Sequence, residues 1–202
     1  MEEFWEKKFR EKQEMWGFRP TISAIKAAEF FSGNRVKNVL IPGIGYGRNA
    51  QVFINKGLNV TGIEISETAI DLAVKNFGES LKIYHGSVKD MPFDSERYDG
   101  IFCHALIHLL DEAERAEFIK NCYDQLADNG YMVFTLISKA APTYGQGERL
   151  SDDRYEQFGG VQMYFYDIMS IEMEFGKYGL IEIQPILENY PFYLITCNKI
   201  LY

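Results

Sequence analysis

The chain has 202 residues, of which 47% are hydrophobic, 25% charged and 15% aromatic, a balance typical of a folded globular protein rather than a disordered one. Its formal net charge of −8 argues against a nucleic-acid partner, because binding the phosphate backbone requires a concentrated positive face. A chain of this length can bury one sizeable core, and we expect a single domain over residues 1–202.

Basic residues near the start of the chain alternate with acidic ones and form no basic patch. Opposite charges three or four positions apart are typical of a solvated helix face with ion pairs. The residues concerned are Glu6, Lys7, Lys8, Arg10, Glu11 and Lys12.

The three cysteines, Cys103, Cys122 and Cys197, lie far apart in the sequence. They form no CxxC pair and no Cys/His group with metal-ligand spacing, so we predict no metal site and expect buried, reduced thiols in a cytoplasmic protein. The sequence does not begin with a basic region followed by an apolar run, and no apolar stretch is long enough to span a bilayer. We therefore expect no signal peptide and no membrane partner.

In chain order, two helices are expected first, over residues 2–16 and from residue 22 to the stop at Gly33. Apolar strands at 36–41, 58–63, 81–84, 98–103 and 131–137 then alternate with helices. Ser66 is a plausible N-cap for the helix that Gly78 closes, and Asp111 with Glu114 forms a plausible capping box for another. This alternation predicts a parallel sheet that is covered on both faces.

The C-terminal part differs from this pattern. Residues 138–166 show no clear periodicity, and we expect a long functional loop there. A helix is predicted over residues 167–178, and two strands follow with only residues 189–191 between them. Because so short a connection permits only an antiparallel hairpin, we predict one, and Pro185 indicates that its first strand lies at the sheet edge.

A glycine-rich turn follows the first strand, and an acidic residue ends the second. Gly43, Gly45 and Gly47 allow the backbone to approach a ligand closely, and Glu64 can accept hydrogen bonds from ribose hydroxyls. These features alone fit a dinucleotide as well as an adenosyl ligand. In the dinucleotide fingerprint, however, the third glycine comes one residue later than it does here.

Taken together, residues 39–49, Glu64, 86–93 and 98–101 resemble the motifs of class I S-adenosylmethionine-dependent methyltransferases. The similarity is greatest to the small-molecule branch that includes the thiopurine and tellurite-resistance methyltransferases. The resemblance implies an α/β fold with a doubly wound, Rossmann-like seven-stranded sheet of order 3-2-1-4-5-7-6, in which strand seven is antiparallel. It also implies S-adenosyl-L-methionine as the cofactor and S-adenosyl-L-homocysteine as its product.

The resemblance further implies roles for individual residues. The glycine loop would hold the methionine end of the cofactor, Glu64 the ribose and Ile65 a face of the adenine. The loop after strand three would hold the adenine edge. The implied cofactor-binding residues there are Ser87, Val88 and Asp90.

One position departs from the family pattern. Many members carry an acidic residue just before the first glycine, whereas this chain has Pro42. The ammonium group of the cofactor would then be held by backbone carbonyls near His104 or by an N-terminal residue. We expect Arg48 and Asn49, at the start of the following helix, to contact the carboxylate.

The catalytic candidate is His104, at the end of the fourth strand, acting as a base or as a cofactor contact. His108 is a weaker candidate for the base, and Cys103 is expected to be a core thiol. A general base is needed only if the acceptor is protonated at the working pH. For the acceptor pocket we predict contributions from the N-terminal region and from the long loop. The residues are Trp16, Phe18, Arg19, Tyr144, Arg149 and Tyr166.

These expectations divide the chain into an N-terminal helical lid (1–33), a cofactor-binding core (34–137), a substrate loop (138–166) and a helix with the closing hairpin (167–202). We predict methyl transfer to an O, N or S atom of a small molecule. Two alternatives stay open: a non-catalytic S-adenosylmethionine-binding module and, less favoured, a nicotinamide-dependent oxidoreductase. The sequence predicts neither the acceptor nor the oligomeric state.

Overall fold

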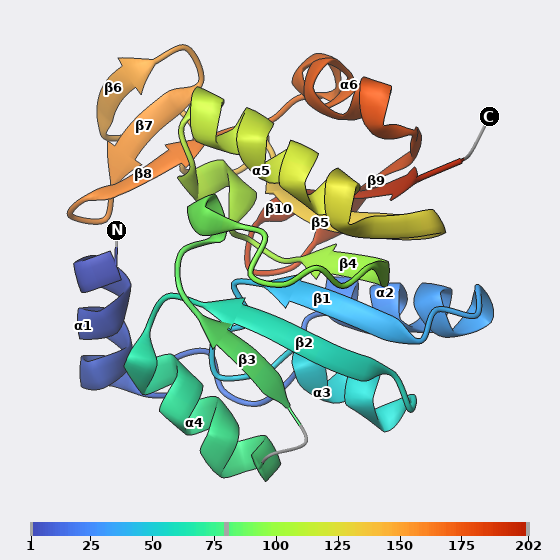
Figure 1. Ribbon diagram of the computed structural model, residues 1–202. Helices are drawn as coiled ribbons and strands as arrows, with labels where there is room; N and C mark the ends of the chain where they lie inside the picture. Colours follow the sequence, from blue (N-terminus) through green and yellow to red (C-terminus); the bar gives the residue numbers. More distant parts are fainter. Residues whose placement is uncertain (1, 79–80, 201–202) are drawn as a thin grey trace.

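The fold is built on one seven-stranded sheet, seen in a computed structural model that describes residues 2–78 and 81–200 (Figure 1). Its strands are β1 (Asn38–Pro42), β2 (Asn59–Glu64), β3 (Lys82–His85), β4 (Tyr98–Cys103), β5 (Leu126–Ile137), β9 (Leu180–Leu187) and β10 (Pro191–Asn198). The order is β3-β2-β1-β4-β5-β10-β9. The first five strands are parallel, and β10 runs antiparallel to both β5 and β9. The predicted sheet order is confirmed.

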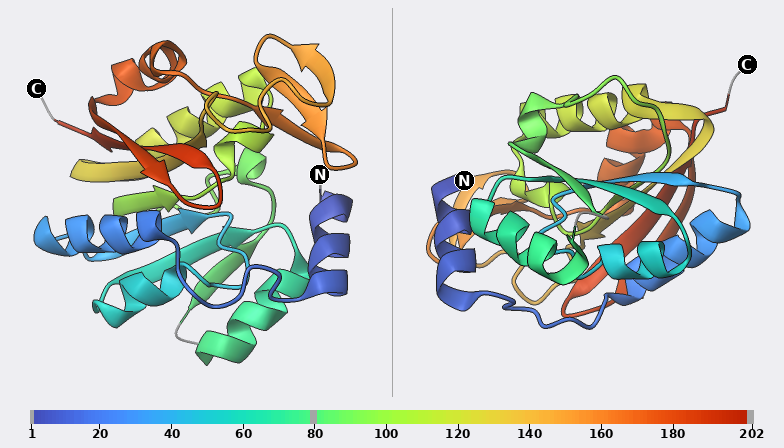
Figure 2. Two further views of the ribbon diagram at one scale, coloured as in Figure 1. Left: turned by 180° about the vertical axis from the view of Figure 1, so that it is seen from behind. Right: turned by 60° about the horizontal axis from the view of Figure 1, so that its bottom comes forward.

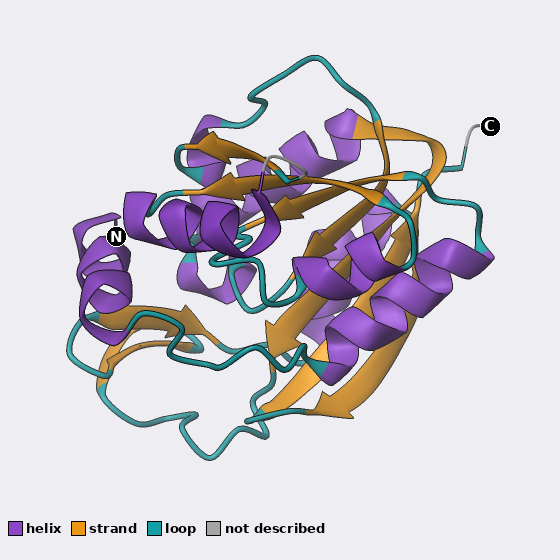
Figure 3. Cartoon of the chain, turned by 90° about the horizontal axis from the view of Figure 1, so that it is seen from below, coloured by secondary structure: helices purple, strands orange, loops and turns teal. Residues whose placement is uncertain are grey.

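Helices cover both faces of this sheet (Figure 3). The α-helices are α1 (Glu2–Lys12), α2 (Ile22–Gly33), α3 (Ala50–Asn55), α4 (Glu67–Phe77), α5 (Glu112–Gln125) and α6 (Ile168–Phe175). The short 3-10 turns are η2 (Val88–Asp90), η3 (Ile107–Leu109) and η4 (Gly176–Tyr178). No helix of the described residues is long and apolar enough to cross a membrane.

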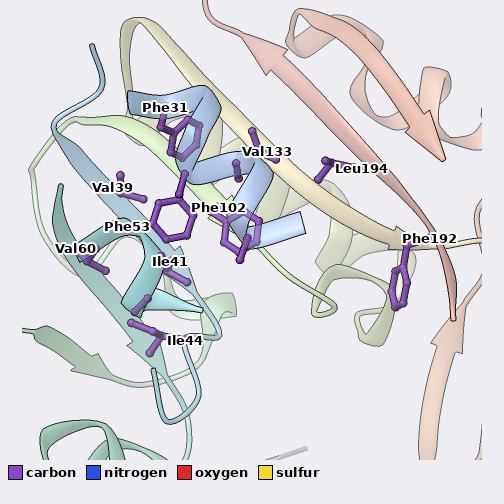
Figure 4. Close-up of a cluster of buried hydrophobic side chains, with 14 of the residues drawn as sticks. Phe31, Val39, Ile41, Ile44, Phe53, Val60, Phe102, Val133, Phe192 and Leu194 are labelled. Carbon is purple, nitrogen blue, oxygen red and sulfur yellow. The ribbon is translucent and has the colours of Figure 1, made fainter. Parts of the chain in front are cut away.

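Alternating side chains of the central strands build two cores. Val39 and Ile41 of β1 pack with side chains of α2 and α3, while Leu40 between them packs on the other face with α5 and α6. On the first face, aromatic rings from α2, α3 and β4 meet beside these strands (Figure 4). The rings of Phe53 and Phe102 lie 5.2 Å apart. This packed cluster lies beside β1 and β4.

The predicted caps are formed. Ser66 Oγ accepts a hydrogen bond from Ala69 N at the start of α4, and Asp111 forms a complete capping box with Glu114 at the start of α5. The first helix ends at Lys12 rather than residue 16, because Gln13 adopts a left-handed backbone conformation. The third helix begins only at Ala50, so residues 43–49 form an extended turn.

The stretch expected as a loop is a small antiparallel sheet instead. Residues 138–166 contain β6 (Glu148–Ser151), β7 (Arg154–Gln157) and β8 (Val161–Tyr164), in the order β6-β7-β8. Four-residue strands are too short to show a reliable alternation in sequence. Edge-to-face contacts among Tyr144, Tyr155 and Phe165 stabilise this segment.

The closing hairpin is present and its edge strand is β9, as Pro185 indicated. Leu187 pairs with Pro191, so residues 188–190 make the turn. An edge strand has one side without strand partners, which is why a proline without an N–H is tolerated there. Views from behind and from below show the hairpin beside α2 and the N-terminal segment (Figure 2).

Candidate functional site

A cavity of about 850 Å³ lies where β1, β2, β3 and β4 end. This volume is within the range of small-molecule sites, and the carboxyl ends of parallel strands are where α/β sheets bind ligands. Residues at the ends of all four strands line it: Glu64 is the last residue of β2, and Gly43, Gly86 and His104 directly follow β1, β3 and β4. The N-terminal segment and the β9–β10 turn close it from the other sides.

The glycine turn is shaped by positive backbone angles. Gly43, Gly45 and Gly47 have φ of 69°, 57° and 83°, a region that side chains other than glycine rarely adopt. A Cβ atom on Gly43 would overlap the side chain of Leu106, and one on Gly47 would collide with Phe77 of α4. Gly43 and Gly45 line the cavity, whereas Gly47 does not and instead permits packing of the turn against α4.

Glu64 is buried at the base of this turn, with 6% of its surface exposed. Its Oε2 accepts a hydrogen bond from Gly45 N at 2.8 Å, and its Oε1 accepts from Ile65 N and Ser66 N at 2.9 and 3.0 Å. Burial raises the pKa of the Glu64 carboxyl, and the three N–H donors oppose that effect. Because a carboxylate has about four acceptor positions, Oε2 keeps capacity for a donor from the cavity.

The loop after β3 supplies the next part of the wall. Ser87 and Val88 line the cavity as predicted, together with Lys89. Asp90 does not: it is exposed and lies outside the lining, because the 3-10 turn η2 directs Val88 inward and Asp90 outward. An adenine contact through the Asp90 side chain is therefore not supported by this geometry.

His104 lies at the cavity end of β4 with its Nδ1 held by two hydroxyl groups. Thr135 Oγ1 is 3.1 Å and Ser23 Oγ 3.2 Å from Nδ1. Burial first, and then the positive charge of Arg48, lowers the pKa of His104 to about 3. Glu188 Oε2, 3.9 Å from Nε2, would raise this pKa, but at that distance no hydrogen bond forms and burial prevails. The imidazole is neutral at physiological pH.

Arg48 and Asn49 both line the cavity. Arg48 Nη1 donates to the Trp16 carbonyl at 3.3 Å, and its guanidinium lies over the Trp16 ring. Asn49 Oδ1 accepts from Thr21 N at 3.0 Å and so anchors the start of α2. Both residues thus join the N-terminal segment to the glycine turn.

The predicted acceptor-pocket residues divide into two groups. Trp16 and Arg19 line the cavity, whereas Phe18 does not, since its ring packs edge-to-face against Tyr46. Neither Tyr144 nor Arg149 reaches the cavity.

The side chains of the 138–166 segment bond instead to one another and to α6. Tyr144 donates to Asp153 at 2.6 Å, and Arg149 pairs with Asp152. Tyr166 is fully buried and donates to Glu174 at 2.9 Å. We correct the expected substrate loop accordingly: Tyr144, Arg149 and Tyr166 are occupied by partners within the fold.

The remaining candidates, His108 and Cys103, are buried. Burial lowers the pKa of His108 to about 3 and raises the pKa of the Cys103 thiol. All three cysteines are buried and free. Within residues 2–78 and 81–200, no three His, Cys, Asp or Glu side chains are grouped so as to hold a metal ion.

Sequence reasoning missed Glu188, a buried acid in the β9–β10 turn that lines the cavity. A glutamate in a hairpin turn looks like an ordinary surface residue in sequence. Its burial depends on Ser23, which lies 165 positions earlier and whose N–H donates to Glu188 Oε1 at 2.9 Å. No local signal could reveal that contact.

Comparison with known proteins relates the chain to methyltransferases. Residues 40–134 match the family model described as a methyltransferase domain. The chain is 30% identical over 112 residues to the ubiquinone biosynthesis O-methyltransferase of Coxiella burnetii, covering 54% of this chain and 47% of that one. It is 26% identical over 133 residues to thiocyanate methyltransferase 1 of Arabidopsis thaliana, covering 64% and 59%. The chain thus spans about half the length of the curated relatives it matches.

Among solved structures, the fold resembles 1,6-didemethyltoxoflavin-N1-methyltransferase of Burkholderia thailandensis, crystallised with its substrate and S-adenosylhomocysteine. The TM-score is 0.76 at 14% identity, and 98% of this chain and 87% of that one are covered. The N-methyltransferase NodS of Bradyrhizobium japonicum gives a TM-score of 0.66 at 16% identity, with 88% and 94% covered. Residues 40–134 thus resemble a methyltransferase domain, and the fold of the whole chain resembles that of solved methyltransferases.

Proposed function

We propose that the protein transfers a methyl group from S-adenosyl-L-methionine to an O, N or S atom of a small molecule. The observation that carries this proposal is the buried Glu64 carboxylate, which lies beneath the glycine turn and keeps acceptor capacity toward an 850 Å³ cavity. The names of the relatives include O- and N-methyltransferases of small molecules, which supports the same class of reaction.

The residues present fit the cofactor. The missing Cβ of Gly43 and Gly45 opens the turn for the methionine end, and Glu64 offers Oε2 to a ribose hydroxyl. Ile65 and Val88 give apolar surface for the adenine ring. When bound, the cofactor supplies a methyl group on a sulfonium, which is already an activated leaving group.

The chain's own residues chiefly have to position the acceptor and the cofactor and to exclude water from the cavity. Alignment of reacting groups supplies roughly 7–11 kcal/mol in favourable cases. His104 and Glu188 face the same cavity, at the end of β4 where the acceptor would approach. The aromatic side chains of Trp5, Phe9 and Trp16 cover the cavity from the N-terminal side and limit the entry of water.

Calorimetric titration with S-adenosylmethionine, S-adenosylhomocysteine and NADH tests the proposal. We expect micromolar binding of both adenosyl ligands, none of NADH, and at least about tenfold weaker binding by Glu64→Ala, because a buried charge-assisted hydrogen bond is lost. Glu67→Ala, three residues on and exposed, is the matched control and should bind like the wild type.

Binding of NADH alone, or of none of the three ligands, would contradict the proposal. If the adenosyl ligands bind but a panel of hydroxyl, amine and thiol acceptors yields no S-adenosylhomocysteine, the alternative of a non-catalytic binding module would be favoured.

A further inference from the structure

The turn between β9 and β10 places one acid, Glu188, against the wall of the cavity. Its side chain is 8% exposed, although it belongs to a three-residue hairpin turn. Ser23, in the first turn of α2, holds it there through a backbone hydrogen bond, and His104, at the end of β4, lies beside it. In the sheet, β2 and β1 separate β4 from β3, and β5 separates β4 from β10, so His104 and the β9–β10 turn lie away from the loop that follows β3.

The hydrogen bonds of Glu188 are incomplete. Oε1 accepts from Ser23 N at 2.9 Å, at the N-terminus of α2, where the helix dipole favours a negative charge. Among the residues that the structure describes, none donates a hydrogen bond to Oε2. Oε2 is not among the buried side-chain atoms that lack a hydrogen bond, so this oxygen is open to the cavity, where a ligand can donate an O–H or N–H to it.

His104 does not satisfy this oxygen. Its Nδ1 edge is occupied by the hydroxyls of Ser23 and Thr135, which leaves Nε2 as the edge toward Glu188. At 3.9 Å the two atoms are too far apart for a hydrogen bond but close enough for one ligand atom to contact both. The imidazole is also neutral, so it provides no formal charge to balance the carboxylate.

Arg48 lines the same cavity, but it interacts with Glu188 only through longer-range electrostatics. Its guanidinium is engaged by the Trp16 carbonyl and ring. Among the described residues, no lysine or arginine therefore forms an ion pair with the Glu188 carboxylate, which faces the cavity beside His104.

We infer that Glu188 Oε2 and His104 Nε2 recognise the methyl acceptor, and that they select a neutral or cationic molecule with an O–H or N–H group over an anionic one. This inference rests on the proposed methyltransferase function. The O–H or N–H donates to Glu188, and the same atom or its neighbour contacts Nε2. An anion such as thiocyanate meets an uncompensated carboxylate and is rejected.

The test compares Glu188→Gln with Glu182→Gln, a control on the exposed part of β9. Calorimetry first gives the Kd of S-adenosylhomocysteine for each protein. The S-adenosylhomocysteine complexes are then titrated with three probes: catechol, its dimethyl ether, which lacks the O–H donors, and thiocyanate.

We expect equal S-adenosylhomocysteine affinity for the wild type and both variants. Catechol should bind the wild type and Glu182→Gln with equal affinity. It should bind Glu188→Gln about tenfold more weakly, because a hydrogen bond to a charged group is lost. The dimethyl ether should not distinguish the proteins. Thiocyanate should bind only after the charge at position 188 has been removed.

Other outcomes overturn the inference separately from the proposed function. If no protein binds S-adenosylhomocysteine, the proposed function fails. If Glu188→Gln weakens the binding of S-adenosylhomocysteine itself, Glu188 holds the amino group of the cofactor and not the acceptor. Equal responses of all proteins to the probes, the absence of binding included, also overturn the inference. Should Glu188→Gln not fold, Glu188→Asp keeps the charge but withdraws it by one methylene, and it should weaken catechol binding while still rejecting thiocyanate.

Discussion

Glu6 of α1 and Ser66, the N-cap of α4, are joined by a hydrogen bond of 2.6 Å from Ser66 Oγ to Glu6 Oε2. Thr68 Oγ1 donates to the other oxygen of Glu6, also at 2.6 Å. The backbone N–H of the same Ser66 donates to Glu64 Oε1 at 3.0 Å. One residue therefore contacts both the carboxylate that anchors the N-terminal helix and the carboxylate at the base of the cavity.

We expect Glu6→Gln to loosen α1, because the three hydrogen bonds that Ser66 and Thr68 donate to Glu6 lose their charge assistance, and the ion pair with Arg10 is also lost. The affinity for S-adenosylhomocysteine should fall several-fold, and the amide protons of α1 should exchange faster. Glu11→Gln, which removes only an exposed i,i+4 ion pair with Lys7, is the control and should change neither. Unchanged affinity together with unchanged exchange would show that Glu6 does not hold the helix.

The same contact has a pH dependence. Hydrogen bonds from Ser66 and Thr68 lower the pKa of Glu6 from 4.5 to about 2. A depressed carboxyl pKa contributes stability that is complete above about pH 4.5 and is lost as the pH falls toward 2. The difference in free energy of unfolding between the wild type and Glu6→Gln should thus be constant from pH 7 to 5 and shrink below 4.5. A difference that changes between pH 7 and 5 would contradict this assignment.

The two buried histidines should destabilise the fold on mild acidification. His104 and His108 have pKa values lowered to about 3, against 6.5 when exposed. Below about pH 6.5 the unfolded chain binds protons that the folded chain excludes, so the free energy of unfolding falls as the pH is lowered. His108→Asn should reduce this slope between pH 6.5 and 5 by up to about 1.4 kcal/mol per pH unit. Denaturant titrations at several pH values measure the free energy of unfolding of both proteins. Identical pH slopes for the wild type and His108→Asn would show that His108 is protonated in the folded state.

Glycine substitutions can separate backbone strain from steric overlap. Gly43 and Gly57 both have positive φ, but a Cβ on Gly43 meets Leu106 whereas one on Gly57 meets open space. Gly57→Ala should cost about 1 kcal/mol of stability from strain alone. Gly43→Ala should cost more and should also weaken S-adenosylhomocysteine binding. Equal effects on stability and binding would mean that Leu106 moves aside freely.

Arg48 is expected to contribute to cofactor binding from the start of the helix that follows the glycine turn. Arg48→Ala should weaken S-adenosylmethionine binding about tenfold, because a charge-assisted hydrogen bond to the carboxylate of the ligand is lost. Lys56→Ala, at an exposed cation near the end of α3, is the matched control. Unchanged calorimetric affinity of Arg48→Ala would remove Arg48 from the site.

Features that depend on a few neighbouring residues were predictable from sequence. Ser66 and Asp111 cap helices because each hydroxyl or carboxylate reaches a backbone N–H three residues on. Pro185 indicated an edge strand because it lacks an N–H. The order of the sheet followed from the family resemblance and not from the periodicity of the strands.

Features that depend on distant contacts or on the rotation of one turn were not predictable. Asp90 and Lys89 differ by one position, and the 3-10 geometry of η2 decides which of the two lines the cavity. Glu188 is buried only because the hairpin turn meets Ser23 of α2. Tyr166 was expected at the acceptor pocket, but its hydroxyl is used by Glu174.

The placement of β10 between β5 and β9 has a consequence for folding. Seven residues of β10 pair with β5, from Phe192 opposite Ile137 to Asn198 opposite Tyr131, across about sixty positions of sequence. Until this late segment arrives, the apolar strand β5 presents an open edge with free N–H and C=O groups, the kind of surface on which chains aggregate. A truncation before Pro191 would leave the edge of β5 permanently unpaired. The solubility of the chain during synthesis therefore depends on how quickly β10 pairs with β5.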